Sequence, residues 1–160
     1  MTGWKKICCA IDFAEPSRVA MEQAADLAKR FEAELVLVHV VVPPPPSASD
    51  VPSWGIATAA AEEHGRTLEE WRVEAERRAG RPVRSRILAG APAAEILRHA
   101  REEGCELIVI GTHGRTGIAR LVLGSVAARV ARESACPVLV VRDHHSLEKE
   151  GEAEEAAQYR

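Results

Sequence analysis

The sequence predicts an α/β protein built on an open, five-stranded parallel sheet. Short apolar runs alternate with helical patterns along the chain, in the order βαβαβαβαβ. The run at 35–42 is apolar almost throughout, which is typical of a strand covered on both faces. A length of 160 residues with 46% hydrophobic and 28% charged content suits one domain with an adequate core. Parallel strands joined by right-handed crossovers, with helices on both faces, follow from this order.

The first half of the chain provides two strands and two helices. The helix at 16–31 begins at a proline and places its apolar residues on one face. The long polar helix at 57–78 carries Leu68, Trp71 and Ala75 on one side. In order, we expect a strand at Lys5–Asp12, a helix at Pro16–Phe31, a strand at Leu35–Val42 and a helix at Ala57–Arg78.

The second half repeats the alternation with shorter elements. Glycines and prolines separate the apolar runs and mark the turns between them. We expect a strand at Val83–Ala89, a helix at Pro92–Glu103, a strand at Leu107–Ile110, a helix at Ser125–Ser134 and a strand at Pro137–Arg142.

The predicted single domain spans residues 1–142, contains a proline-rich loop at 43–53 and is followed by an acidic segment at 143–160. Residues 43–53 contain five prolines, so a polyproline rod, a mobile flap over a binding site or a plain linker is expected there. Residues 143–160 carry a net charge of −4 and are expected to be a flexible acidic tail. The remaining residues then sum to +1, which lacks the basic excess of a nucleic-acid-binding protein.

The chain is expected to be cytoplasmic and to have no membrane partner, since its apolar runs are too short for a signal-peptide core or a membrane span. The four cysteines lack metal-binding spacing, and buried thiols are favoured over a redox or metal role. His39 is interpreted as a core residue in a strand, whereas His64 and His99 are assigned to polar helix faces.

The segment GTHGRTGIARLVLGSV, residues 111–126, is the strongest functional pattern. It places glycines, a basic loop and a Gly-Ser pair between a buried strand and a helix. Gly111 and Gly114 allow close approach of a ligand, and Ser125 is placed to cap a helix whose positive end favours an anion. No acid occurs between Gly111 and Arg132. The segment therefore predicts a phosphate-binding loop, with glycines that serve only as turns as the alternative.

The same residues resemble a known family. Gly111, Gly114 and Gly124-Ser125 have the spacing of the ATP-binding signature of the universal stress protein family. The stretches ICCAIDFAEP, LVLVHV, Gly90-Ala91-Pro92 and PVLVVR are also similar to it, so the resemblance covers about residues 4–142. It implies an adenine nucleotide alpha hydrolase-like fold with strand order 3-2-1-4-5. In that order the end of the first strand and the loop after the fourth meet at one site.

The resemblance also implies which residues bind nucleotide. Asp12 would accept hydrogen bonds from the ribose or the adenine amine, although it could instead cap the following helix. His113, Arg115 and Arg129 are weaker candidates, because loop cations are more often solvated. The implied contacts, on the adenosine side and then along the loop, are Ala10, Asp12 and Val40, followed by Gly111, His113, Gly114, Arg115, Gly124, Ser125 and Val126.

These observations predict an ATP-binding stress-response regulatory protein, with ADP or AMP as possible ligands and Mg²⁺ bridging the phosphates. A slow ATP hydrolase and a nucleotide-free dimeric scaffold are the alternatives. Neither a dinucleotide fingerprint, a Walker loop nor a nucleophile elbow is present. The strand at 138–141 is continuously apolar and lies at the sheet edge in the implied order, so it is expected to form a homodimer.

Overall fold

The computed structural model describes residues 3–43, 54–112 and 123–142, and its sheet has the expected order. Five parallel strands lie side by side as β3-β2-β1-β4-β5. The strand order implied by the family resemblance is therefore confirmed. The elements along the chain are β1 (Lys6–Ile11), α1 (Glu15–Phe31), β2 (Glu34–Val41), α2 (Trp54–Ala79), β3 (Val83–Ala89), α3 (Pro92–Glu102), β4 (Leu107–Gly111), α4 (Ser125–Glu133) and β5 (Val138–Val141).

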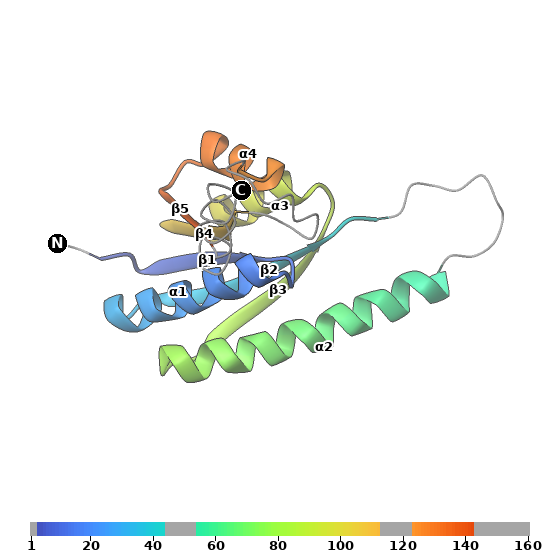
Figure 1. Cartoon of the computed structure of the whole chain (residues 1–160), viewed down its shortest axis with the longest axis horizontal. Coiled ribbons are helices and arrows are strands. Elements are labelled where there is room, and N and C mark those ends of the chain that lie inside the picture. Colours follow the sequence, from blue (N-terminus) through green and yellow to red (C-terminus); the bar gives the residue numbers. More distant parts are fainter. Residues whose placement is uncertain (1–2, 44–53, 113–122, 143–160) are drawn as a thin grey trace, which may run out of the picture.

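Two layers of helices enclose the sheet. Helices α1 and α2 cover one face, and α3 and α4 cover the other (Figure 1). Side chains alternate between these faces along each strand: Cys9 and Ile11 of β1 join the core beneath α1 and α2, whereas Cys8 and Ala10 join the core beneath α3 and α4. Burial on both faces explains why β1, β2 and β4 read as continuous apolar runs.

The element boundaries differ from the sequence-based expectations mainly at α2. This helix begins at Trp54, three residues before the expected start at Ala57. Gly55 lowers the helical propensity of the first turn of α2, so the sequence pattern predicts a later start. The proline-rich residues 44–53 and the acidic residues 143–160 lie outside the described part of the chain. No helix within that part is long and apolar enough to cross a membrane.

Candidate functional site

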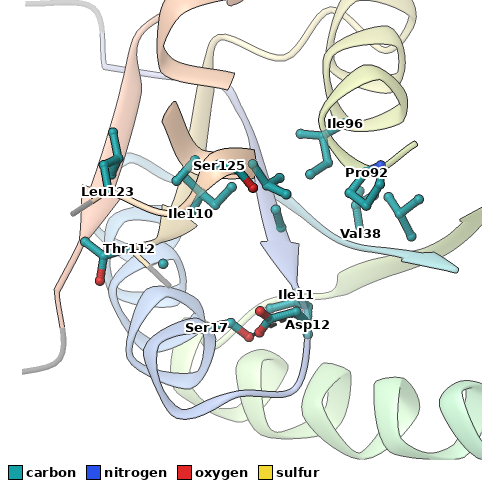
Figure 2. A pocket seen from close by; sticks show the side chains of 16 residues that line it. Ile11, Asp12, Ser17, Val38, Pro92, Ile96, Ile110, Thr112, Leu123 and Ser125 are labelled. Atoms are coloured by element: carbon teal, nitrogen blue, oxygen red, sulfur yellow. Dashed lines mark hydrogen bonds between the residues drawn. The ribbon is translucent and has the colours of Figure 1, made fainter. Parts of the chain in front are cut away.

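A cavity of about 370 Å³ opens at the carboxyl ends of β1, β2 and β4. The chain reverses its winding between β1 and β4, and ligands of open α/β sheets bind at such switch points. The strands, the loop before α1 and the first turns of α3 and α4 all contribute (Figure 2). The lining residues are Ala10, Ile11, Asp12, Ser17, Val38, Val40, Pro92, Ile96, Ile110, Gly111, Thr112, Leu123, Gly124, Ser125, Val126 and Ala127.

Most of the residues expected at a nucleotide site line this cavity. They come from positions more than 100 residues apart in the chain and are Ala10, Asp12, Val40, Gly111, Gly124, Ser125 and Val126. His113, Gly114 and Arg115 lie outside the described residues. Arg129, a weaker candidate, is absent from the lining and forms an ion pair of 3.2 Å with Glu133 one helical turn later.

One side of the cavity is apolar. Val38 and Val40 of β2 lie on the α3 side of the sheet, as does Ile110 of β4, and all three line the cavity. Pro92 and Ile96 come from the first turns of α3 and lie close to Val38 (Figure 2). This side offers a flat aromatic group only nonpolar contacts, and hydrogen bonds to such a group would have to come from the backbone.

The amino end of α4 forms the opposite side. Its N-cap is Gly124, with φ −55° and ψ 150°, and no side chain of the described residues caps the helix. The expectation that Ser125 is the cap is therefore wrong, because Ser125 is already the first helical residue. The first intrahelical bond runs from the Ala128 N–H to the Gly124 carbonyl at 2.8 Å. The N–H groups of residues 125–127 precede this bond and have no intrahelical acceptor.

Backbone hydrogen bonds fix this amino end to the sheet. The N–H of Gly124 donates to the carbonyl of Thr112 at 2.7 Å, which closes the base of the loop between them. The N–H of Thr112 donates to the carbonyl of Val141 at 3.0 Å. The first turn of α4 is thus tied to the end of β4 and, through Thr112, to the end of β5.

Gly111 has a packing role that the sequence did not reveal. A Cβ atom at this position would lie 2.8 Å from the backbone C and O atoms of Pro16 and 3.0 Å from the backbone N of Ser17. Such contacts are too short for any side chain, so the glycine permits α1 to approach β4. It therefore places Ser17 at the cavity, whether or not a ligand also contacts Gly111.

Asp12 lies in a tight turn between β1 and α1. Its Oδ1 accepts a hydrogen bond of 3.0 Å from the N–H of Ala14, and its own N–H donates to Ser17 Oγ at 3.2 Å. The N-cap of α1 is Ala14, which receives no side-chain cap. Asp12 therefore stabilises the turn that leads into α1 without capping the helix, and its carboxylate remains at the cavity wall (Figure 2).

A cluster of rings supports this turn from the α2 side. Phe13 adopts φ 65°, an uncommon conformation for a side chain of this size, and its ring lies 4.4 Å from that of His39 and 5.5 Å from that of Trp71. His39 is buried, and its Nδ1 is 2.8 Å from the Ile11 carbonyl, so it donates to that oxygen. The core assignment of His39 is confirmed, and the histidine holds the last carbonyl of β1.

Two other histidines lie elsewhere than expected. His64 contacts a core residue, since its Nδ1 is 3.1 Å from Nε2 of His39. In a neutral His39 ring whose proton is on Nδ1, Nε2 accepts this hydrogen bond and His64 donates it. His99 is only 6% exposed, and within the described residues its buried Nε2 has no hydrogen-bond partner. Burial lowers the pKa of His99, which favours the neutral ring.

Sequence reasoning missed the residues that complete the cavity. Pro92 and Ile96 read as the start and the apolar face of an ordinary helix, and Thr112 as a loop residue. Only the parallel register of β2 with β3, which brings the start of α3 to the same edge of the sheet, places Pro92 and Ile96 at the site. The one sequence signal that could have indicated Thr112 as a site residue is its position directly after a strand.

The comparisons with known proteins agree with this geometry. The model of the universal stress protein family matches residues 3–142. Universal stress protein MJ0531 of Methanocaldococcus jannaschii is 36% identical over 148 residues, which cover 87% of this chain and 82% of the relative.

Two solved structures have the same fold. One, a universal stress protein in complex with cAMP, is 25% identical with a TM-score of 0.62 and covers 88% of this chain and 98% of its own. The other, from Archaeoglobus fulgidus in complex with dAMP, is 22% identical with a TM-score of 0.64 and covers 88% of this chain and 99% of its own. Family model, relative and fold agree over nearly all of residues 3–142, and the chain belongs to the universal stress protein family.

Proposed function

We propose that this protein is a regulatory module that binds ATP, with Mg²⁺ bridging the phosphates. The observation that carries the proposal is the pairing, in one cavity, of an apolar side with the open amino end of α4. Three backbone N–H groups without intrahelical acceptors and the positive end of the helix dipole favour an anion. The nucleotide complexes known for universal stress proteins support adenosine phosphates as the ligand class.

The two sides of the cavity fit the two parts of a nucleotide. A volume of about 370 Å³ lies within the usual range of ligand pockets. The base would lie between Val40 and Pro92, the ribose near Asp12, and the phosphates at Ser125 and Val126. A carboxylate at Asp12 can accept hydrogen bonds from ribose hydroxyls, whereas it would repel a phosphate. This assignment gives Val40, Asp12 and the first turn of α4 separate roles, at the base, the ribose and the phosphates.

The metal ion would arrive with the nucleotide. Within the described residues, no group of three histidine, cysteine or acidic side chains could hold a metal ion. Mg²⁺ commonly keeps several waters and binds through substrate phosphates, so a dedicated protein cage is not required. Ser125 Oγ, at the first turn of α4, is an oxygen that could face such an ion. His113 and Arg115, in the loop outside the described residues, are proposed to offset the remaining phosphate charge.

Regulation is favoured over rapid hydrolysis by the chemistry of the lining. Asp12 is the one ionisable side chain among the described lining residues, and one of its oxygens already accepts a hydrogen bond from Ala14. A general base must reach the attacking water, and we place Asp12 at the ribose, away from the phosphates. We therefore keep slow hydrolysis as a side activity and not as the function.

A second copy of this chain is the proposed partner at β5. Among the residues that the structure describes, this strand pairs with β4 alone, and the exposed fraction of Leu139 is 37%. An edge strand with unpaired backbone groups and apolar side chains favours pairing with another strand. Two-fold pairing of β5 with itself would be antiparallel and would close the edge.

The cavity assignment can be tested by filling the base side. A Val40→Trp substitution should weaken binding of ATP and of adenosine at least tenfold, because the indole would occupy the space assigned to adenine. Val42→Trp is the matched control, since Val42 lies just beyond the same strand, is 62% exposed and does not line the cavity. Calorimetric titration of both variants decides the matter. Equal affinities in the two variants would refute the assignment of the adenine base to the apolar side of the cavity.

A further inference from the structure

Three of the four thiols gather at the opposite end of the sheet from the nucleotide cavity. Cys8 lies in β1 on the face beneath α3, Cys105 lies in the turn between α3 and β4, and Cys136 lies in the turn between α4 and β5. A second cavity of about 210 Å³ opens between these two turns, and both Cys105 and Cys136 line it. The sequence-based assignment of inert buried thiols did not foresee this arrangement.

Cys8 and Cys105 form a pair with unequal access to solvent. Both belong to the buried cluster beneath α3 and α4, and hydrogen bonding between their thiols is the largest influence on the pKa of each. Cys8 is fully buried, whereas Cys105 borders the cavity and is 8% exposed. The backbone holds Cys105 in place, since its N–H donates to the Ala100 carbonyl at 2.8 Å and the next N–H, of Glu106, donates to the Lys6 carbonyl at 2.9 Å. A small reagent in the cavity would therefore meet Cys105 first.

The surroundings of the pair favour a thiolate on Cys105. Hydrogen bonding from Cys8 and the cations Lys6 and Arg84 lower the pKa of Cys105, whereas burial and the Glu103 carboxylate raise it, and the net shift is downward. Lys6 is fixed nearby, because its Nζ donates to the Glu103 carbonyl at 2.8 Å and to Glu103 Oε2 at 3.2 Å. The pKa of Cys8 is raised by its hydrogen bond to Cys105 and by burial. A thiolate in a positive, partly accessible setting is the reactive form of cysteine.

We propose that Cys105 and Cys8 are a peroxide-reactive pair that oxidises to an intramolecular disulfide between β1 and the α3–β4 turn. The Cys105 thiolate attacks one oxygen of a hydroperoxide, which breaks the O–O bond; the other oxygen takes a proton and leaves as water or an alcohol. Cys105 is then a sulfenic acid. The sulfur of Cys8 attacks it, the S–S bond forms, and hydroxide leaves with the Cys8 proton as water. Two thiols are oxidised for each peroxide reduced.

The other two cysteines provide internal controls. Cys9 is as deeply buried as Cys8 but points to the opposite face, and burial raises its pKa. Cys136 borders the same cavity, but its Sγ lies 3.5 Å from Ser134 Oγ, and it is not the hydrogen-bond partner of Cys105. Oxidation confined to Cys8 and Cys105 would therefore reflect their arrangement and not exposure alone.

The test is hydrogen peroxide treatment of the folded protein, followed by thiol blocking and peptide mapping without reduction. Tryptic cleavage leaves Cys8 and Cys9 in one peptide, 7–18, so mapping is done on the Cys9→Ala variant. We expect peptide 7–18 to be linked to peptide 102–115, and the number of free thiols in the wild-type chain to fall from four to two. Cys136→Ala should behave as the wild type does.

Removing either partner should separate the two steps. In Cys8→Ala, no disulfide should form, and Cys105 should accumulate a sulfenic acid that a cyclic 1,3-dione traps. In Cys105→Ala, Cys8 should remain a free thiol. If Cys8→Ala fails to fold, the peptide map of the Cys9→Ala variant still shows whether a disulfide forms between Cys8 and Cys105. Three results would overturn the proposal. The first is a link between peptides 102–115 and 133–142, and the second is a disulfide between two copies of the chain. The third is four free thiols in the wild-type chain after treatment with a peroxide dose that fully oxidises glutathione.

Discussion

A proline at position 125 would remove one backbone donor from the proposed phosphate site while preserving the helix. Ser125 is the first residue of α4, where proline is tolerated because the N–H has no intrahelical acceptor. Gly124 has φ −55° and ψ 150°, close to the extended polyproline II conformation, which a residue before proline can adopt. Ser125 is also exposed, so the ring has space. We therefore expect Ser125→Pro to fold normally.

The expected loss of affinity follows from the hydrogen bond that is removed. A charge-assisted N–H bond to a phosphate contributes about 1.5–3 kcal/mol, which corresponds to roughly tenfold to a hundredfold in Kd. Ser125→Pro also removes the hydroxyl, so Ser125→Ala is the matched reference: it lacks the hydroxyl and keeps the N–H. Ser125→Pro should bind ATP about tenfold or more weakly than Ser125→Ala.

Calorimetric titration with ATP and Mg²⁺, and separately with adenosine, measures this difference. The two variants should bind adenosine alike, because the base and ribose lie away from α4 in the proposed arrangement. Thermal unfolding of both variants checks that the helix is intact. Equal ATP affinities in two folded variants would refute the assignment of the phosphates to the amino end of α4.

Three further outcomes are expected. Asp12→Ala should weaken ATP binding about tenfold or more, while inorganic triphosphate is affected much less; equal losses for both ligands would show that Asp12 does not contact the adenosine. Steady-state ATP turnover should be absent or well below ~1 per second, and a faster rate would require a base that the cavity lining does not explain. Val140→Pro should disrupt a β5 dimer in light scattering, whereas deletion of 146–160 should leave it intact; a deletion that creates dimers from a monomer would reject that interface.

The fold was predictable because each element leaves a clear pattern. β2 reads LVLVHV since both of its faces are buried, and even His39 within it is satisfied by the Ile11 carbonyl. Strand order is different, because periodicity does not say which strands are neighbours. The order came from the family resemblance, and its pairing of β1 with β4 brings Asp12 and Gly111 to one cavity.

The details of the site depend on short-range geometry that residue type does not determine. A serine before a helix can be its N-cap or its first residue, and Ser125 is the latter because Gly124 takes the extended conformation. Gly111 was expected to allow approach of a ligand, yet the nearest obstacle to a side chain is the backbone of Pro16. His99 lies between charged positions in the sequence, but packing of α3 on the sheet buries it.

The central claim is that the cavity at the carboxyl ends of β1, β2 and β4 holds an adenine nucleotide. The most direct measurement is mass analysis of the small molecules released when the purified protein is denatured, before and after incubation with ATP and Mg²⁺. We predict release of an adenine nucleotide in an amount comparable to that of the protein, and its loss in Val40→Trp but not in Val42→Trp. Absence of adenine nucleotide from the wild-type chain after incubation with ATP and Mg²⁺ would contradict the account.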